Sequence, residues 1–182
     1  SAILKMFHMS RKDEPFADVI ASLKLTPVSI SYEYDPCDQA KARELYTRAT
    51  TGSYTKQPGE DDKSIGLGIT GYKGRVHVHF GDPITSGFED AKQLAALTDA
   101  QILTGYRLFP VHYLAYAMWS ERDPQLEVPA AESLFGADEL AAAKEQWQQR
   151  LSRCPSEQQP YLILQYAMPV RNQYRVKAGP PL

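Results

Sequence analysis

The stretch LTPVSISYEYDPCDQAKARELYTRATTGSYTKQPGEDDKSIGLGITGYKGRVHVHFGDPI, residues 25–84, decides the fold. Near its start, apolar and polar side chains alternate over residues 27–34 (PVSISYEY), the period of two that is typical of a half-buried strand. Near its end, residues 75–80 (RVHVHF) alternate in the same way. The segment between them favours helices. We therefore predict one strand, helix, helix, strand unit.

The start of the first helix of this unit carries its own signals. Asp35 is a good N-cap, Pro36 fits the first helical position, and Asp38 places an acid near the positive end of the helix. We expect the helix to run to about residue 49, with an apolar stripe on one face and a basic opposite face. Glycines and polar residues predict a loop over 50–62, and weak helical periodicity follows over 63–70.

The rest of the chain is expected to be helical. Apolar spacing predicts short helices over residues 3–9 and 16–23, and further helices within 91–102, 111–119, 140–151 and 161–168. The predicted class is α/β with few strands: residues 1–87 form a partial α/β domain, and residues 88–182 form a helical C-terminal region packed on it. Two strands rarely make a stable sheet by themselves, so either other strands escape the pattern or residues outside this chain complete the sheet.

Composition excludes several classes of protein. A formal charge of −2 on 182 residues gives no basic field for nucleic acid, and no apolar stretch is long enough to span a bilayer. Cys37 and Cys154 are too few for a disulfide framework and too far apart for a zinc motif, which favours a reducing, cytoplasmic location. Cys37 is expected to be a small core residue rather than a nucleophile. The start, Ser1 followed by Ala2, is expected to be a cut end rather than a leader.

Two pairs have the form His-x-x-x-x-Asp, which in acyl transfer supplies a general base and the carboxylate that orients it. They are His8 with Asp13 and His77 with Asp82. Residues five apart lie on opposite faces of a strand and on different faces of a helix, so only an intervening turn brings such a pair together. His77 and His79 share one strand face and could present two imidazoles to a metal, but we expect half-exposed polar positions and no metal.

The loop between the two central helices offers backbone N–H groups, hydroxyls and Lys56, and Arg48 and Arg75 could converge on it. Such a set can hold a phosphate through charge-assisted hydrogen bonds. It lacks the glycine and lysine order of a nucleotide-binding P-loop. The alternative is a solvated loop in which Lys56 pairs with Glu60 or Asp61.

Residues 26–33, 52–61 and 73–83 together resemble the C-terminal half of bacterial glycerolipid acyltransferases, the glycerol-3-phosphate and lysophosphatidate O-acyltransferases. Pro27 and Val28 match the Pro-Val of an apolar strand in that family, and a Gly-Arg-Val strand followed by Gly and Pro comes later. The resemblance covers roughly residues 3–115, and residues beyond them carry no signature of the family.

The resemblance implies a catalytic His-x-x-x-x-Asp block and a phosphate-binding Glu-Gly-x-Arg block ahead of the strand at Pro27. Too few residues separate Asp13 from Pro27 for these elements, and no Glu-Gly occurs in the chain. His8 and Asp13 are therefore interpreted as a coincidence, and the chain as a fragment that lacks the catalytic block and is inactive alone. The resemblance implies that Pro27 and Val28 line the acyl or acceptor pocket. Contact with phosphate is expected from these residues: Arg48, Lys56, Arg75.

The expected partners are acyl-CoA or acyl-carrier protein as donor and a glycerolipid as acceptor, with no further cofactor and no nucleic acid. Peripheral contact with the inner face of the membrane is a hypothesis, and so is a homo-oligomer formed through an open sheet edge. Four tail aromatics suit a membrane interface, although core packing is the favoured interpretation: Tyr113, Tyr116, Trp119 and Trp147. The alternative function is a non-catalytic α/β module that binds a lipid or a phosphate ligand.

Overall fold

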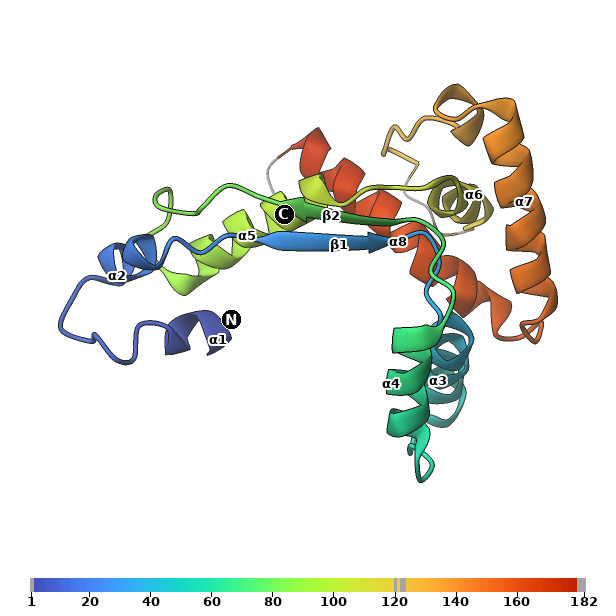
Figure 1. The fold of residues 1–182 in the computed structure, drawn as a ribbon, viewed down its shortest axis with the longest axis horizontal. Helices are drawn as coiled ribbons and strands as arrows, with labels where there is room; N and C mark the ends of the chain where they lie inside the picture. Colours follow the sequence, from blue (N-terminus) through green and yellow to red (C-terminus); the bar gives the residue numbers. More distant parts are fainter. Residues whose placement is uncertain (1, 120, 122–123, 180–182) are drawn as a thin grey trace. The chain divides into compact units, whose positions relative to one another are not determined.

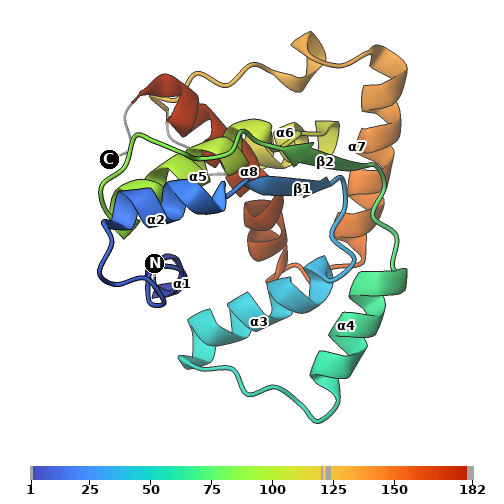
Figure 2. The same ribbon diagram turned by 60° about the vertical axis from the view of Figure 1, so that its left-hand side comes forward.

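The computed structural model describes residues 2–119, 121 and 124–179 and confirms the mixed α/β class. Most of the chain is helical, and the two strands lie side by side in both ribbon views (Figures 1 and 2). The elements are α1 (Ala2–Met6), α2 (Phe16–Leu23), β1 (Val28–Tyr32), α3 (Asp38–Thr51), α4 (Glu60–Thr70), β2 (Val76–Phe80), α5 (Ala91–Gly105), α6 (Pro110–Met118), the 3-10 turn η1 (Ala131–Ser133), α7 (Ala137–Ser152) and α8 (Gln159–Ala178).

The chain divides into two compact units that interleave along the sequence. The first unit contains the chain up to Ser31, His77–Arg107 and the chain from Arg175, and the second contains Tyr32–Val76 and Leu108–Tyr174. The first unit has a small core of four buried side chains: Ile20, Ile84, Phe88 and Leu94. The second unit has a larger, aromatic core to which α6, α7 and α8 contribute. The predicted boundary at residue 87 stays a prediction.

Both predicted strands are confirmed, and they pair antiparallel. At one end of the ladder the Glu33 N–H donates to the Arg75 carbonyl at 2.9 Å, and at the other end the Gly81 N–H donates to the Pro27 carbonyl at 2.8 Å. These two hydrogen bonds determine how the strands align. In this alignment Ile30 lies directly opposite Val78, and their side chains share one face of the sheet. The opposed pairs on that face are Val28 with Phe80, Ile30 with Val78, and Tyr32 with Val76.

The sheet buries its polar face, which reverses the expected orientation. Ser29 and Ser31 are 3% and 0% exposed, whereas Val28 and Ile30 are 40% and 48% exposed. The half-buried pattern is therefore confirmed, but serines occupy the buried side. Tyr34, beyond the end of β1, is buried.

A close approach of α5 to the sheet explains this reversal. A Cβ atom added to Gly81 would lie 2.2 Å from the Gln101 side-chain oxygen, and one added to Gly105 would lie 2.2 Å from the His79 ring. The Arg107 N–H, just after α5, donates to the Ser31 hydroxyl at 2.8 Å. Only small side chains fit between β1 and α5, so the larger apolar residues of β1 face outward.

Helix α3 begins later than predicted. It starts at Asp38 instead of Pro36, because the Asp35 carboxylate accepts a hydrogen bond from the Cys37 N–H at 2.8 Å and forms a local turn before the helix. Pro36 therefore precedes the helix. The second central helix is confirmed and begins at Glu60, three residues earlier than the predicted 63–70.

Helix α8 is much longer than the predicted 161–168, because it continues through Pro169. Proline removes one helix donor and costs about 3 kcal/mol in a helix interior. Buried residues lie on both sides of it, with Leu162 and Tyr166 before and Val170 after. Burial of this stripe against the core of the second unit offsets the cost of the proline.

The tail aromatics pack mainly inside the second unit. Tyr113, Tyr116 and Trp147 are 8%, 6% and 2% exposed, so the favoured interpretation of core packing is confirmed for them. Trp119 is half-buried and packs against the same core. Among the helices that the structure describes, none combines the length and the apolar character needed to cross a bilayer.

Candidate functional site

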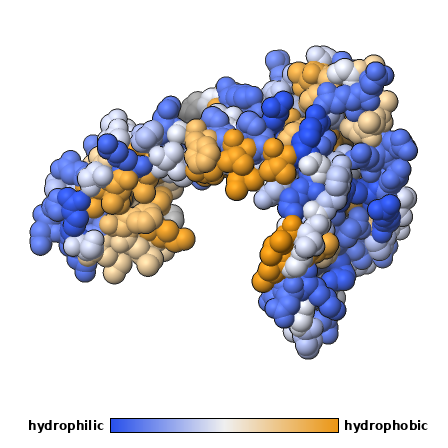
Figure 3. Space-filling model, viewed as in Figure 1, coloured by the Kyte–Doolittle hydropathy of each residue, from blue (hydrophilic) through white to orange (hydrophobic). Residues whose placement is uncertain are grey.

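The exposed side of the sheet carries only apolar side chains in the first unit. Val28, Ile30, Val78 and Phe80 form this outer face, and they are 40%, 48%, 47% and 70% exposed. Hydrophobic residues gather along the strands in the space-filling view (Figure 3). A small soluble domain normally turns such side chains inward, and a contiguous exposed apolar patch marks a surface made for contact.

Pro27 and Val28, the predicted pocket residues, point to opposite faces of the sheet. Pro27 is buried and its carbonyl belongs to the ladder, whereas Val28 lies on the outer face. Successive side chains of a strand always alternate in this way. Only Val28 is therefore available to a ligand on the outer face.

Arg75, a predicted phosphate contact, is engaged by acidic residues of the second unit. Its guanidinium bonds the Glu33 carboxylate at 2.8 Å and the Glu139 carboxylate at 2.5 Å, and it lies 4.9 Å from the centre of the Phe109 ring. Burial alone would raise the pKa of Glu33, but the hydrogen bonds and charge of Arg75 outweigh burial and lower it. Arg75 is thus held within the second unit by two carboxylates and an aromatic ring of that unit.

The other two predicted phosphate contacts also have partners of their own. Lys56 pairs with Asp61 at 2.5 Å, one of the two pairings considered for this loop, and Arg48 pairs with Glu44 at 2.9 Å. The three cations share no partner in these pairings. Each of them therefore takes part in a separate ion pair, and their contact with phosphate stays a prediction.

The Glu60 carboxylate, in the first turn of α4, is hydrogen-bonded to residues of α3 and of the loop between α3 and α4. Its carboxylate accepts hydrogen bonds from the Tyr54 hydroxyl, from the Gln57 N–H at 2.9 Å and from the Arg43 guanidinium at 3.3 Å. These bonds lower the pKa of Glu60, with the bond from Tyr54 as the largest cause. The Glu60 carboxylate therefore already accepts hydrogen bonds from three donors in and beside this loop.

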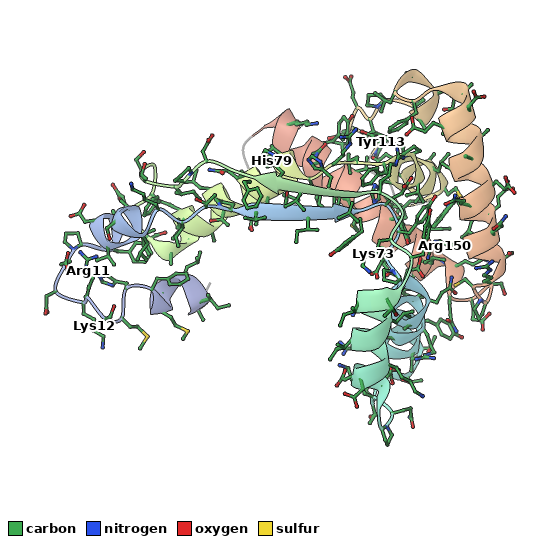
Figure 4. All side chains as sticks on the ribbon, in the orientation of Figure 1. Arg11, Lys12, Lys73, His79, Tyr113 and Arg150 are labelled. Carbon is green, nitrogen blue, oxygen red and sulfur yellow. The ribbon has the colours of Figure 1, made fainter. Side chains whose placement is uncertain are left out.

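Among the described residues, no hydrogen bond or ion pair joins His8 to Asp13 or His77 to Asp82. The His8 ring lies 2.7 Å from the Glu14 carbonyl oxygen and packs edge-on against Phe16. His79, seen on the strand in Figure 4, packs against Gly105. No group of three His, Cys, Asp or Glu side chains with metal-binding geometry occurs in the part of the chain that the structure describes.

The Cys37 thiol is half-buried at the start of α3. It lies 3.4 Å from the Ser64 carbonyl oxygen. Burial and the nearby carboxylates of Asp35 and Asp38 raise its pKa, which disfavours the thiolate. This environment fits the predicted packing role and gives no activation of a nucleophile.

A buried polar cluster in the second unit has no counterpart in the sequence analysis. The Asp38 carboxylate accepts from the Arg150 guanidinium at 2.5 Å and from the Tyr166 hydroxyl at 2.7 Å. The Arg150 guanidinium also lies 4.6 Å from the centre of the Tyr34 ring. Burial, followed by the charge of Asp38, raises the pKa of Tyr166. Because every charge in the cluster is paired, it fixes the start of α3 to α7 and α8.

Comparison with known proteins gives no relative. No protein-family model, curated protein or solved structure matches the chain. The outer face is the feature with the clearest consequence, because contiguous exposed apolar side chains mark a surface made for contact.

Proposed function

We propose that these 182 residues form part of the catalytic domain of a glycerolipid O-acyltransferase. The reaction moves a fatty acyl group from acyl-CoA or acyl-carrier protein to a hydroxyl of a glycerol-phosphate-type acceptor. Residues outside this chain supply the His-x-x-x-x-Asp block. The proposal rests on the resemblance of residues 26–33, 52–61 and 73–83 to that family.

The outer face is the observation that supports this proposal most directly. A sheet with one face against α5 and an apolar second face is the arrangement of strands inside a larger α/β domain, where both faces are covered. Each strand also leaves one edge unpaired, since two strands form the sheet in the described part of the chain. Further strands and a covering layer would complete it, and the proposed upstream block provides them.

In the proposed reaction, the upstream histidine removes the proton of the acceptor hydroxyl, and the hydroxyl oxygen attacks the thioester carbonyl. The tetrahedral intermediate collapses to the new ester and expels the thiolate, which takes up the proton. Val28 and its neighbours on the outer face contribute an apolar wall beside the acyl chain. No histidine of this chain is assigned the role of base.

A non-catalytic lipid-binding module is the second candidate, and the same outer face favours it. Apolar strand residues bind a fatty acyl chain without any chemistry. The phosphate-binding version loses support, because Lys56, Arg48 and Arg75 are each paired with carboxylates. The acyltransferase requires a His-x-x-x-x-Asp block in the same gene product, whereas the lipid-binding module does not.

The decisive experiment compares this chain with the full product of its gene. Each is incubated with radiolabelled palmitoyl-CoA and either glycerol-3-phosphate or lysophosphatidate, and lipid products are separated. We expect transfer only by a gene product that contains an upstream His-x-x-x-x-Asp block, and loss of transfer when that histidine becomes alanine. His8→Ala serves as the matched control and should leave activity unchanged.

Two results would overturn the proposal. Turnover by the 182-residue chain that His8→Ala abolishes would place the base inside this chain. A complete gene without the upstream block would remove the enzyme from consideration, and binding of a fluorescent fatty acid to the outer face would then support the lipid-binding module.

A further inference from the structure

The second unit contains an aromatic cleft that the acyl-transfer proposal does not use. It has a volume of about 450 Å³, within the size range of small-molecule sites. Residues of α3, of the end of α6 and the chain just after it, and of the first turns of α8 and the chain just before it form its walls: Tyr46, Met118, Trp119, Glu121, Glu157, Pro160, Tyr161, Ile163 and Leu164. The cleft lies entirely within this unit.

Three aromatic rings line the cleft at steep angles to their neighbours. Tyr46 and Tyr161 meet edge to face, with centroids 6.1 Å apart and planes at 68°. Trp119 packs in the same manner against Tyr116, at 6.1 Å and 61°. Rings set at such angles present electron-rich faces in different directions, as in the sites that bind alkylated ammonium groups by cation–π attraction.

The charge of the cleft has one sign. Glu121 and Glu157 are its ionisable acids, and the described lining residues include no lysine or arginine. The Ser156 hydroxyl donates to Glu157 at 3.3 Å, and neither glutamate forms an ion pair with any described residue. The cleft therefore attracts cations and repels phosphates and acyl-CoA.

We propose that this cleft binds a small organic cation: a methylated or alkylated ammonium group on an apolar body. The ammonium group lies against the faces of Trp119 and Tyr161 and near the carboxylates, and the apolar body contacts the aliphatic wall that Ile163 and Leu164 provide. A metal ion does not suit the site, because its walls are aromatic and aliphatic rather than rich in ligands. This function is independent of acyl transfer.

The first experiment measures binding by isothermal titration calorimetry with matched probes. Choline and 3,3-dimethylbutan-1-ol have the same shape and differ in the charged nitrogen, and benzyltrimethylammonium adds an apolar body. We expect choline to bind about tenfold tighter than the neutral alcohol, and benzyltrimethylammonium to bind tighter than choline. Equal binding of choline and the alcohol, or no binding of benzyltrimethylammonium at millimolar concentration, would overturn the proposal.

The second experiment assigns binding to the cleft with variants. Tyr161→Leu removes one ring and should weaken benzyltrimethylammonium binding by about tenfold. The exposed Glu157→Gln changes no packing, and we expect binding to weaken by about threefold, less in high salt. Glu145→Gln removes the same charge from the exposed face of α7 and is the control.

Unchanged affinity in both cleft variants would show that the cation binds elsewhere and contradict the assignment. Thermal unfolding of each variant checks that the fold is retained. If Tyr161→Leu fails to fold, the Glu157→Gln result decides, because that side chain is exposed and isosteric with its replacement.

Discussion

The Tyr166 hydroxyl donates a hydrogen bond to the Asp38 carboxylate at 2.7 Å, although 128 residues separate the two in sequence. Both side chains are buried, at 4% and 1% exposed. The same hydroxyl accepts a hydrogen bond from the Asp35 N–H at 2.9 Å. Together with Arg150, which also bonds this carboxylate, Tyr166 compensates the buried charge at the start of α3.

Arg150→Met should lower the free energy of unfolding by about 3 to 5 kcal/mol, because it leaves the Asp38 carboxylate buried without its counter-charge. Urea unfolding followed by circular dichroism measures this loss. The double variant Asp38→Asn/Arg150→Met should be more stable than Arg150→Met alone, since the orphaned charge is removed with its partner. Arg153→Met, at the exposed end of α7, is the control and should change stability little.

His112 makes the fold sensitive to moderate acid. Its ring is 2% exposed and its Nδ1 accepts a hydrogen bond from the Phe109 N–H at 2.9 Å. Burial lowers the pKa of His112 to about 4, against the small opposing effect of the Glu33 charge. Between about pH 6.5 and about pH 4, His112 therefore binds a proton in the unfolded chain but stays neutral in the folded chain. The free energy of unfolding should suffer no loss from His112 above about pH 6.5, and it should fall by about 3 kcal/mol as the pH drops to about 4.

Urea titrations at a series of pH values between these limits measure the effect. His112→Gln keeps a hydrogen-bond acceptor but has no proton to gain, so its stability should vary much less over this range. An equally steep loss in His112→Gln would assign the acid sensitivity to other groups. The lowered pKa of Glu33 adds a loss with the same sign, but only below its ordinary range near 4.5.

Local patterns in the sequence predicted the strands and most helices, because period and capping depend on neighbouring residues. They did not predict which face of β1 is buried, since that depends on how closely α5 approaches Ser29 and Ser31 from far along the chain. The continuation of α8 through Pro169 likewise depends on burial against the core and not on helix propensity.

For the candidate site residues, too, the sequence indicated pairings between near neighbours but not between residues far apart in the chain. Lys56 pairs with Asp61 five residues away, and the sequence included that pairing as an alternative. Arg75 pairs with Glu33 and Glu139, and Asp38 with Arg150 and Tyr166, across separations that no local pattern reports. The acid at the helix start was recognised, but its burial was not.

Gly74 is required where the chain enters β2. Its φ is +63°, and a Cβ atom there would lie 2.7 Å from the Glu33 carboxylate and 2.8 Å from the Tyr34 ring. Gly74→Ala should therefore destabilise the fold by about 2 to 4 kcal/mol, through backbone strain and disruption of the bonds between Glu33 and Arg75. Thermal and urea unfolding measure the loss.

Gly66→Ala is the matched control, because the same substitution at the exposed middle of α4 meets no atom within 4 Å. It should raise stability by about 0.5 to 1 kcal/mol, since alanine favours the helix and restricts the unfolded chain. Equal effects of the two substitutions would contradict the assigned role of Gly74.

Substitutions on the outer face test whether its apolar side chains stabilise this chain alone or serve contact with another layer. Ile30→Thr and Val78→Thr should each change the stability of the 182-residue chain by less than about 0.5 kcal/mol, because both side chains are exposed. Both should also reduce the fluorescence of bound anilinonaphthalene sulfonate. If the proposed covering layer is present in a longer gene product, the same substitutions should destabilise that product by about 1 to 2 kcal/mol.

Ser31→Val tests the opposite face and completes the argument. Its hydroxyl accepts the Arg107 N–H at 2.8 Å and the residue is 0% exposed, so valine removes a buried hydrogen bond and adds bulk where α5 lies close. We expect a loss of about 1 to 3 kcal/mol in the 182-residue chain itself. A stabilising Ser31→Val together with a destabilising Ile30→Thr would mean that the strand buries its apolar side after all, and the proposed covering layer would lose its basis.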